Sequence, residues 1–330
     1  MKTSALLRSI VFAGLVVGGT TLGRAHAAPL TPEKARQIAM DSYIYGYSLI
    51  TTEVTRVQMT NVDKIEGLHA PTGQFINVKR YPPGDYRGVS APDADTLYSL
   101  AWLDVGAEPM VFSHPDMGNR YYLFPMYSLW MPVIESPGKR TAGDKAATYL
   151  LTGPGWQGEV PAGMKQIKSP TKYMLILGRT YADGMEEDYK IVNELQAQYK
   201  AEPLSAYGKS YTFVAPKVNP TPGFSMTDKP QAVIDAMDTS TYFNMMAKLM
   251  GDTAPPAQED APIVTKMAEI RLVPGMPFDL TKLDPAVQDA LKDVGKVASA
   301  SPRSLVLRAP RCLDDSLIFT DGLRHETATT

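Results

Sequence analysis

Cysteine and histidine are scarce in this sequence. The chain of 330 residues has one cysteine, Cys312, so no disulfide can form within it. It has four histidines, none of them in an H-x-H or H-E-x-x-H pattern, so a zinc site would need ligands from distant parts of the chain. We therefore expect neither a disulfide scaffold nor a metal site, and no cofactor.

An excess of basic charge and the common catalytic signatures are also missing. The formal net charge is -2, which lacks the basic footprint of nucleic-acid-binding proteins, so we expect no nucleic-acid partner. There is no G-x-S-x-G elbow and no G-x-x-x-x-G-K-[ST] phosphate loop. With 44% hydrophobic and 21% charged residues, the composition is that of a folded protein rather than a disordered one.

The N-terminus has the pattern of a secretory signal peptide. Lys2 and Arg8 provide a basic start, residues 10–22 are largely apolar, and residues 25–27 read Ala-His-Ala. The apolar stretch is shorter than the roughly 20 residues that span a bilayer, which favours cleavage over a retained anchor. We expect residues 1–27 to be removed and the mature chain to be periplasmic or secreted, with no membrane anchor.

Helical patterns lie at both ends of the mature chain. Residues 31–60 begin with Thr31 as a capping residue and Pro32 in the first turn, and apolar residues recur at helical spacing after them. Helical patterns return at about 188–200, 229–250, 258–270 and 284–298.

Strands are expected between these helical parts, at about 75–182. Short apolar and aromatic runs alternate there with Pro- and Gly-rich turns. The runs lie at 98–103, 110–112, 121–124, 148–151 and 173–177. The sequence therefore predicts an α+β fold in which an antiparallel β-sandwich or barrel is combined with an N-terminal helix and a C-terminal helical segment.

The last residues differ in composition from the rest. Residues 301–330 are rich in arginine and contain Cys312. We interpret residues 28–300 as one domain and 301–330 as an atypical tail. The tail is explained either as a solvated extension or by a change of reading frame near residue 303.

Two carboxylates precede the first long strand pattern. If the chain is extended there, Asp93 and Asp95 lie on one face with their Cα atoms about 7 Å apart. Paired acids can separate their pKa values, as general acid/base chemistry requires. The alternative is that both are turn residues whose side chains bond to backbone amides.

Arginines and aromatic residues supply the other candidate groups. Arg140 and Thr141 stand in a basic turn at 138–143 that could hold an anion, and Arg179 ends an apolar strand. The flat surfaces expected to bind a sugar or an aromatic ligand belong to Tyr98, Tyr122, Tyr127 and Trp130, although a core role is the commoner one for each. His114 is expected in a turn.

The chain resembles the DUF1254 family of uncharacterised bacterial proteins. The resemblance rests on an ordered set of motifs over about 31–300. These are Pro-Asp-Ala-Asp-Thr-Leu-Tyr-Ser at 92–99, Arg-Tyr-Tyr at 120–122, Pro-Gly-Lys-Arg-Thr-Ala-Gly at 137–143, Gly-Pro-Gly-Trp at 153–156, Pro-Ala-Gly at 161–163 and Leu-Gly-Arg-Thr at 177–180. It implies a mostly β fold, often followed by a DUF1214 jelly-roll domain, of which no copy is recognisable here. The family often has Asn at the position of Asp93, which favours Asp95 as the catalytic residue.

Two functional hypotheses follow. The first is a metal-independent hydrolase or lyase acting on a small molecule or carbohydrate, with Asp95 as acid or base and Tyr98 donating a proton or stacking. The second is a noncatalytic module that binds a carbohydrate, small ligand or protein partner through the same surface. The substrate-binding residues would be Asp93, Arg120, Tyr122, Trp130, Arg140, Thr141 and Arg179.

Overall fold

The computed structural model describes residues 30–85, 93–253 and 258–299. The predicted signal peptide and the atypical tail lie outside the described residues. The compact unit begins at Thr31, and the description below concerns that unit. In the ranges that the structure describes, no helix is both long and apolar enough to cross a bilayer.

Helix α1 (Pro32–Thr60) begins as the sequence predicts. The Thr31 hydroxyl accepts a hydrogen bond from the backbone N–H of Lys34 at 3.2 Å, and Pro32 occupies the first turn, where its missing N–H costs nothing. Ile38, Leu49 and Val54 are buried along the helix.

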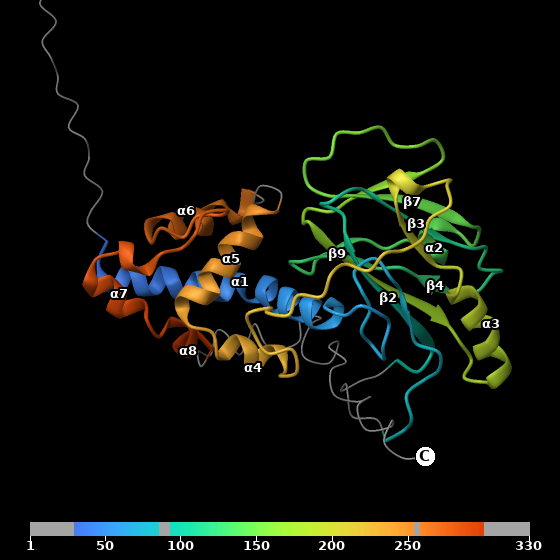
Figure 1. The fold of residues 1–330 in the computed structure, drawn as a ribbon, viewed down its shortest axis with the longest axis horizontal. Helices are drawn as coiled ribbons and strands as arrows, with labels where there is room; N and C mark the ends of the chain where they lie inside the picture. The colour runs from blue at the N-terminus through green and yellow to red at the C-terminus, as the bar shows by residue number, and fades with distance from the viewer. Residues whose placement is uncertain (1–29, 86–92, 254–257, 300–330) are drawn as a thin grey trace, which may run out of the picture. The chain divides into compact units, whose positions relative to one another are not determined.

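The C-terminal helices pack around α1 (Figure 1). They are α4 (Pro230–Asp235), α5 (Thr239–Gly251), α6 (Ala261–Glu269), α7 (Pro285–Leu291) and α8 (Val294–Ser299). Tyr242 of α5 stacks on Tyr43 of α1 with ring centroids 4.2 Å apart, and its hydroxyl donates to the Tyr43 carbonyl. Asp238 caps α5, which divides the predicted 229–250 helix in two. Short 3-10 turns lie at Leu204–Ala206, Gln258–Asp260 and Leu280–Lys282.

The strands form two sheets. The first contains β1 (Ile76–Asn77), β2 (Thr96–Asp104), β4 (Tyr122–Leu123), β5 (Met126–Ser128), β6 (Val133–Glu135) and β9 (Tyr173–Tyr181) in the order β1-β2-β9-β5-β6, with β4 also on β9. The second contains β3 (Met110–His114), β7 (Ala147–Thr152), β8 (Lys165–Lys168) and β10 (Lys200–Pro203) in the order β10-β3-β7-β8. The β7–β8 pair is parallel, and the other named pairs are antiparallel.

One apolar core lies between the two sheets. Side chains alternate along each strand, so every second residue of β2 and β9 points inward. The core includes Ala101, Leu103, Met174 and Ile176 from the first sheet and Phe112, Tyr149, Leu151 and Ile167 from the second. The α+β prediction is confirmed. The barrel alternative is wrong, because each sheet has free edges and the two are not closed into one.

The other face of the first sheet meets the second half of α1. A small cavity of about 50 Å³ lies there, and Thr51 and Thr55 of α1 and Leu100 and Leu177 of the sheet line it. Helix α3 (Glu186–Gln196) ends beside β2. The side-chain amide of Gln196, its last residue, donates hydrogen bonds of 3.1 Å each to the carbonyls of Val78 and Tyr98.

Candidate functional site

Asp93 and Asp95 form a turn before β2. The Oδ1 atom of Asp93 accepts a hydrogen bond from the Asp95 N–H at 3.3 Å, and its Oδ2 atom accepts one from the Thr96 hydroxyl. The strand begins at Thr96, so the chain is not a strand at Asp93 and Asp95, and Asp93 is a turn residue as in the alternative interpretation. Asp95 is exposed.

The two carboxyl groups nevertheless have separated pKa values. Burial opposes the ionisation of Asp93, but hydrogen bonds with Asp95 and Thr96 and the charge of Arg179 outweigh it and lower its pKa. The hydrogen bond with Asp93, followed by the negative charge of Asp93, raises the pKa of Asp95. The pair therefore holds its first proton on Asp95.

Arg179 and Tyr98 lie beside this pair. They face each other in the register of β2 and β9, and the Arg179 guanidinium is 5.1 Å from the centre of the Tyr98 ring. The Nη1 atom of Arg179 is 3.9 Å from Oδ2 of Asp93, while its side chain is 36% exposed. Burial raises the pKa of the Tyr98 phenol, the Arg179 charge lowers it, and Asp93 and Asp95 raise it further. Tyr98 is thus a neutral phenol next to a cation.

Tyr81 also belongs to this site, and the sequence analysis missed it. Burial raises the pKa of its phenol to about 12, and Tyr189, Asp93 and Asp95 add to the effect, so both carboxyl groups lie within electrostatic reach of it. Its hydroxyl donates to the Ala182 carbonyl at 2.5 Å. No motif marks Tyr81, because its position depends on contacts that are distant in the sequence. Tyr189, whose hydroxyl accepts the Tyr81 N–H, comes 108 residues later.

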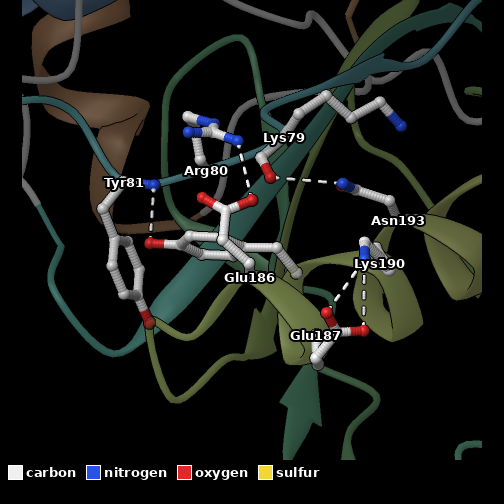
Figure 2. Close-up of polar contacts among 8 residues, drawn as sticks. Lys79, Arg80, Tyr81, Glu186, Glu187, Lys190 and Asn193 are labelled. Atoms are coloured by element: carbon white, nitrogen blue, oxygen red, sulfur yellow. Dashed lines mark hydrogen bonds and ion pairs between the residues drawn. The ribbon is translucent and has the colours of Figure 1, made fainter.

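Figure 2 shows how α3 holds the segment that carries Tyr81. The Tyr81 N–H donates to the Tyr189 hydroxyl at 3.3 Å, and the Asn193 amide donates to the Lys79 carbonyl at 3.3 Å. Arg80 forms an exposed ion pair with Glu186 at 3.1 Å. These contacts fasten residues 79–81 to α3.

The other predicted residues lie elsewhere. Arg120 makes a bidentate ion pair with Asp188, at 3.0 and 2.6 Å, and so fastens the start of α3. Trp130 packs against Tyr45 of α1, with ring centroids 5.0 Å apart. Both side chains are thus engaged in contacts between elements of the fold.

Three more of the predicted residues gather near α2 (Lys139–Ala142). Arg140 donates to the Tyr121 hydroxyl at 3.3 Å. Thr141 caps α2 by accepting from the Gly138 N–H, while Tyr122 is buried and donates to the Gly143 carbonyl at 2.8 Å. The structure therefore brings together Asp93, Asp95, Tyr98 and Arg179, whereas Arg120, Trp130 and the α2 group are engaged in other contacts.

His114 is buried in strand β3 and does not lie in a turn as expected.

Across residues 30–85, 93–253 and 258–299, no group of three or more His, Cys, Asp and Glu side chains could hold a metal ion. Residues 153–158 spell G-x-G-x-x-G, but they lie in the loop between β7 and β8 with no helix after them, which is not the setting of a dinucleotide site.

Comparisons with known proteins support the fold, and one family model matches part of the chain. The chain resembles the crystal structure of the VPA0106 protein from Vibrio parahaemolyticus, with a TM-score of 0.60 and 24% sequence identity over 87% of this chain. It spans 64% of the length of that protein. No curated protein matches it. Residues 72–203, which include the carboxyl pair, Tyr98 and Arg179, match the family described as "Protein of unknown function (DUF1254)", so the predicted resemblance is confirmed for that segment.

Proposed function

We propose that this chain is an enzyme that uses Asp93 and Asp95 for general acid/base chemistry on a small molecule or carbohydrate, as a hydrolase or lyase. The observation that carries the proposal is the arrangement of an exposed carboxyl group, Asp95, next to a carboxylate, Asp93, that is held by hydrogen bonds and lies beside the partly exposed Arg179. The opposite directions of the two pKa shifts agree with this arrangement. Pairs of titratable groups whose environments separate their pKa values supply the acid and the base of many active sites.

Each residue of the site has a role in this proposal. Asp95 is exposed and keeps its proton to higher pH than an ordinary aspartic acid, so it donates that proton to the leaving group. Asp93 remains ionised and holds the proton donor in place. The carboxylate left on Asp95 then takes up a proton from the attacking water in a hydrolase, or from the substrate carbon in a lyase, which restores the acid. Arg179 is partly exposed and binds a carbonyl or anionic oxygen of the substrate. Tyr98 orients the guanidinium through its ring.

A noncatalytic binding module is the second candidate. Both oxygens of Asp93 already accept local hydrogen bonds, which favours a fixed surface for recognition. In that case Tyr98 and Arg179 bind the ligand, and Asp95 affects only the affinity.

Carboxyl titration followed by NMR tests the acid/base proposal without a known substrate. We expect Asp95 to titrate above, and Asp93 below, the ordinary value for aspartic acid of about 3.9. In Asp93→Asn, the pKa of Asp95 should fall toward that value. Ordinary titration of both groups in the wild-type chain would contradict the proposal.

Turnover assays then separate the two candidates. A panel of p-nitrophenyl esters and p-nitrophenyl glycosides is assayed from acid to neutral pH, and Asp95→Asn should abolish any hydrolysis found. Asp116→Asn is the control, because Asp116 is likewise an exposed aspartic acid outside the strands, and its carboxylate accepts the Gly118 N–H at 2.8 Å. An unchanged rate in Asp95→Asn assigns the site to binding.

Export is a further part of the proposal. It is supported by the basic start, apolar stretch and Ala-His-Ala of residues 1–27. The carboxyl pair would then act in the periplasm or outside the cell.

A further inference from the structure

The cavity between α1 and the first sheet lies on the face of that sheet that points away from the second sheet. Its sheet side consists of Leu100, Trp102, Tyr127, Leu175 and Leu177. Leu100 pairs with Leu177 in the β2–β9 register, and both Trp102 and Tyr127 pair with Leu175. The residues next to them along the strands belong to the core between the sheets, as do Ala101, Met126 and Ile176. Since side chains alternate along a strand, the five lining residues share the outer face.

Helix α1 closes the cavity from the other side, through Thr51, Thr52, Thr55 and Met59. The Thr51 hydroxyl donates to the Tyr47 carbonyl at 2.7 Å, and the Thr55 hydroxyl donates to the Thr51 carbonyl at 2.8 Å. Both protons are therefore used within the helix. No acidic or basic side chain is among the described residues that line the cavity, so it offers no partner to a charged group.

An unpaired hydrogen-bond donor is present in the lining. Trp102 is 4% exposed, and its indole Nε1 atom is buried with no hydrogen-bond partner in the part of the chain that the structure describes. Most buried N–H groups in proteins are hydrogen-bonded, because an unpaired one has lost its bonds with water. An acceptor oxygen placed in the cavity within reach of this N–H would therefore be stabilised.

The size of the cavity limits what can enter it. One water needs about 10–15 Å³ of such space, so a cavity of about 50 Å³ has room for roughly three to five non-hydrogen atoms. A cavity that binds benzene measures about 150 Å³. The cavity thus fits a short aliphatic group and excludes an aromatic ring.

The cavity adjoins the carboxyl site. Tyr98 and Arg179 are the next cross-strand pair on the same face after Leu100 and Leu177, about 7 Å further along the strands. Burial is the main cause of the raised pKa of Tyr98, and Tyr127 of the cavity lining adds to it. A molecule in the cavity can therefore extend along the sheet to Arg179.

We propose that the cavity binds a short oxoalkyl group, and that the substrate of the carboxyl site is an oxo acid or a derivative of one that carries this group. The ketone oxygen accepts the Trp102 N–H, and the alkyl carbons contact Leu100 and Leu177. The carboxyl end of the molecule lies at Arg179. Binding in the cavity stands by itself, whereas the assignment to a substrate rests on the proposed function.

Titration of the full chain with butan-2-one tests the cavity. The readouts are the NMR signals of the Trp102 Nε1–H and of the Leu100 and Leu177 methyl groups, and all three should shift. Trp102→Phe removes the donor and should weaken binding, followed on the methyl signals, about three- to tenfold. Acetophenone, which carries an aromatic ring, should not bind.

A pair of threonine variants supplies the control. Thr51→Phe should abolish butan-2-one binding by filling the cavity from a half-buried position. Thr60→Phe should not, because Thr60 is also a half-buried threonine of α1 whose hydroxyl donates to a helix carbonyl, but it does not line the cavity. The cavity proposal is overturned if butan-2-one leaves the three signals unchanged, as in a cavity that takes only water, or if the two variants act alike.

The substrate assignment is tested with 4-oxopentanoate, which is butan-2-one extended by a carboxylate. It should bind about tenfold more tightly than butan-2-one, and Arg179→Gln should remove that advantage while leaving butan-2-one affinity unchanged. Equal affinities of the two compounds in the wild type would overturn the assignment. Asp95→Asn should bind butan-2-one like the wild type, so a failure of the acid/base proposal is seen in the carboxyl titration and not here.

Discussion

The Oδ2 atom of Asp93 lies 3.9 Å from Nη1 of Arg179, and this contact ties the turn before β2 to strand β9. The same oxygen accepts the Thr96 hydroxyl. One carboxylate therefore closes a local turn and holds a residue that is distant in the sequence. Substitution at Asp93 should affect both.

The first prediction compares the stability of two variants at Asp93, to distinguish its role in the turn from its charge contact with Arg179. Asp93→Ala should lower the free energy of unfolding by about 1–3 kcal/mol, because it removes two hydrogen bonds at a side chain that is only 13% exposed. Asp93→Asn keeps an acceptor oxygen and should cost less. Urea unfolding measures both, and equal losses would show that the charge rather than the turn matters.

The second prediction concerns pH and the ion pair of Asp188 with Arg120. The hydrogen bond from Arg120 lowers the pKa of Asp188 in the folded chain. Its stabilising effect is therefore present above the unfolded pKa of about 3.9 and is lost as the pH falls through the lower folded value. Asp188→Asn should cost about 2 kcal/mol at pH 7 and much less in strong acid.

Unfolding of the wild type and Asp188→Asn at several pH values checks this. Asp289→Asn is the control, since Asp289 pairs with Lys292 on the surface with a side chain 74% exposed and should change little. A difference between wild type and Asp188→Asn that stays constant with pH would contradict the assignment.

The third prediction concerns close packing at Gly178. A Cβ atom there would lie 2.7 Å from the Phe124 ring and 3.1 Å from the Ser99 carbonyl oxygen, both within the sandwich. Gly178→Ala should cost about 1–3 kcal/mol by overpacking. The double variant with Phe124→Leu should recover part of this loss in thermal unfolding. Additive losses in the double variant would mean that the ring is not the obstacle.

The fourth prediction tests export. Expression of the full chain in a Gram-negative host should yield a periplasmic protein whose intact mass corresponds to a start at residue 28. Val16→Asp, which places a charge in the apolar stretch, should retain the uncleaved chain in the cytoplasm. A periplasmic product of unchanged mass would point to an uncleaved N-terminus.

The sequence predicted the longer elements because their patterns are local. Apolar and aromatic runs locate β2, β3, β7 and β9, and the Thr31-Pro32 start locates α1. The short strands β1, β5, β6, β8 and β10 were missed, since two to four residues are too few to show an alternating pattern. Asp93, Asp95 and Tyr98 were found together because they are neighbours in the chain.

The remaining site residues depend on distant contacts. Arg179 meets Tyr98 only through the register of β2 and β9, and Arg120 is committed to Asp188 by the position of α3. No local pattern distinguishes an arginine that pairs within the fold from one that awaits a ligand. Tyr81 shows the same limit, since contacts with Ala182 and with Tyr189 of α3, both about 100 residues later, hold it in place.

The β2–β9 register also constrains the order of folding. Leu100 pairs with Leu177, so β2 must wait until the chain has been made through β9 before it gains its long partner. Closing the long loop between β2 and β9 costs conformational entropy before the contacts between the two strands can offset it. A nascent chain that ends before β9 therefore carries the carboxyl turn without its arginine, and the proposed chemistry arises only when the second half of the sandwich is complete.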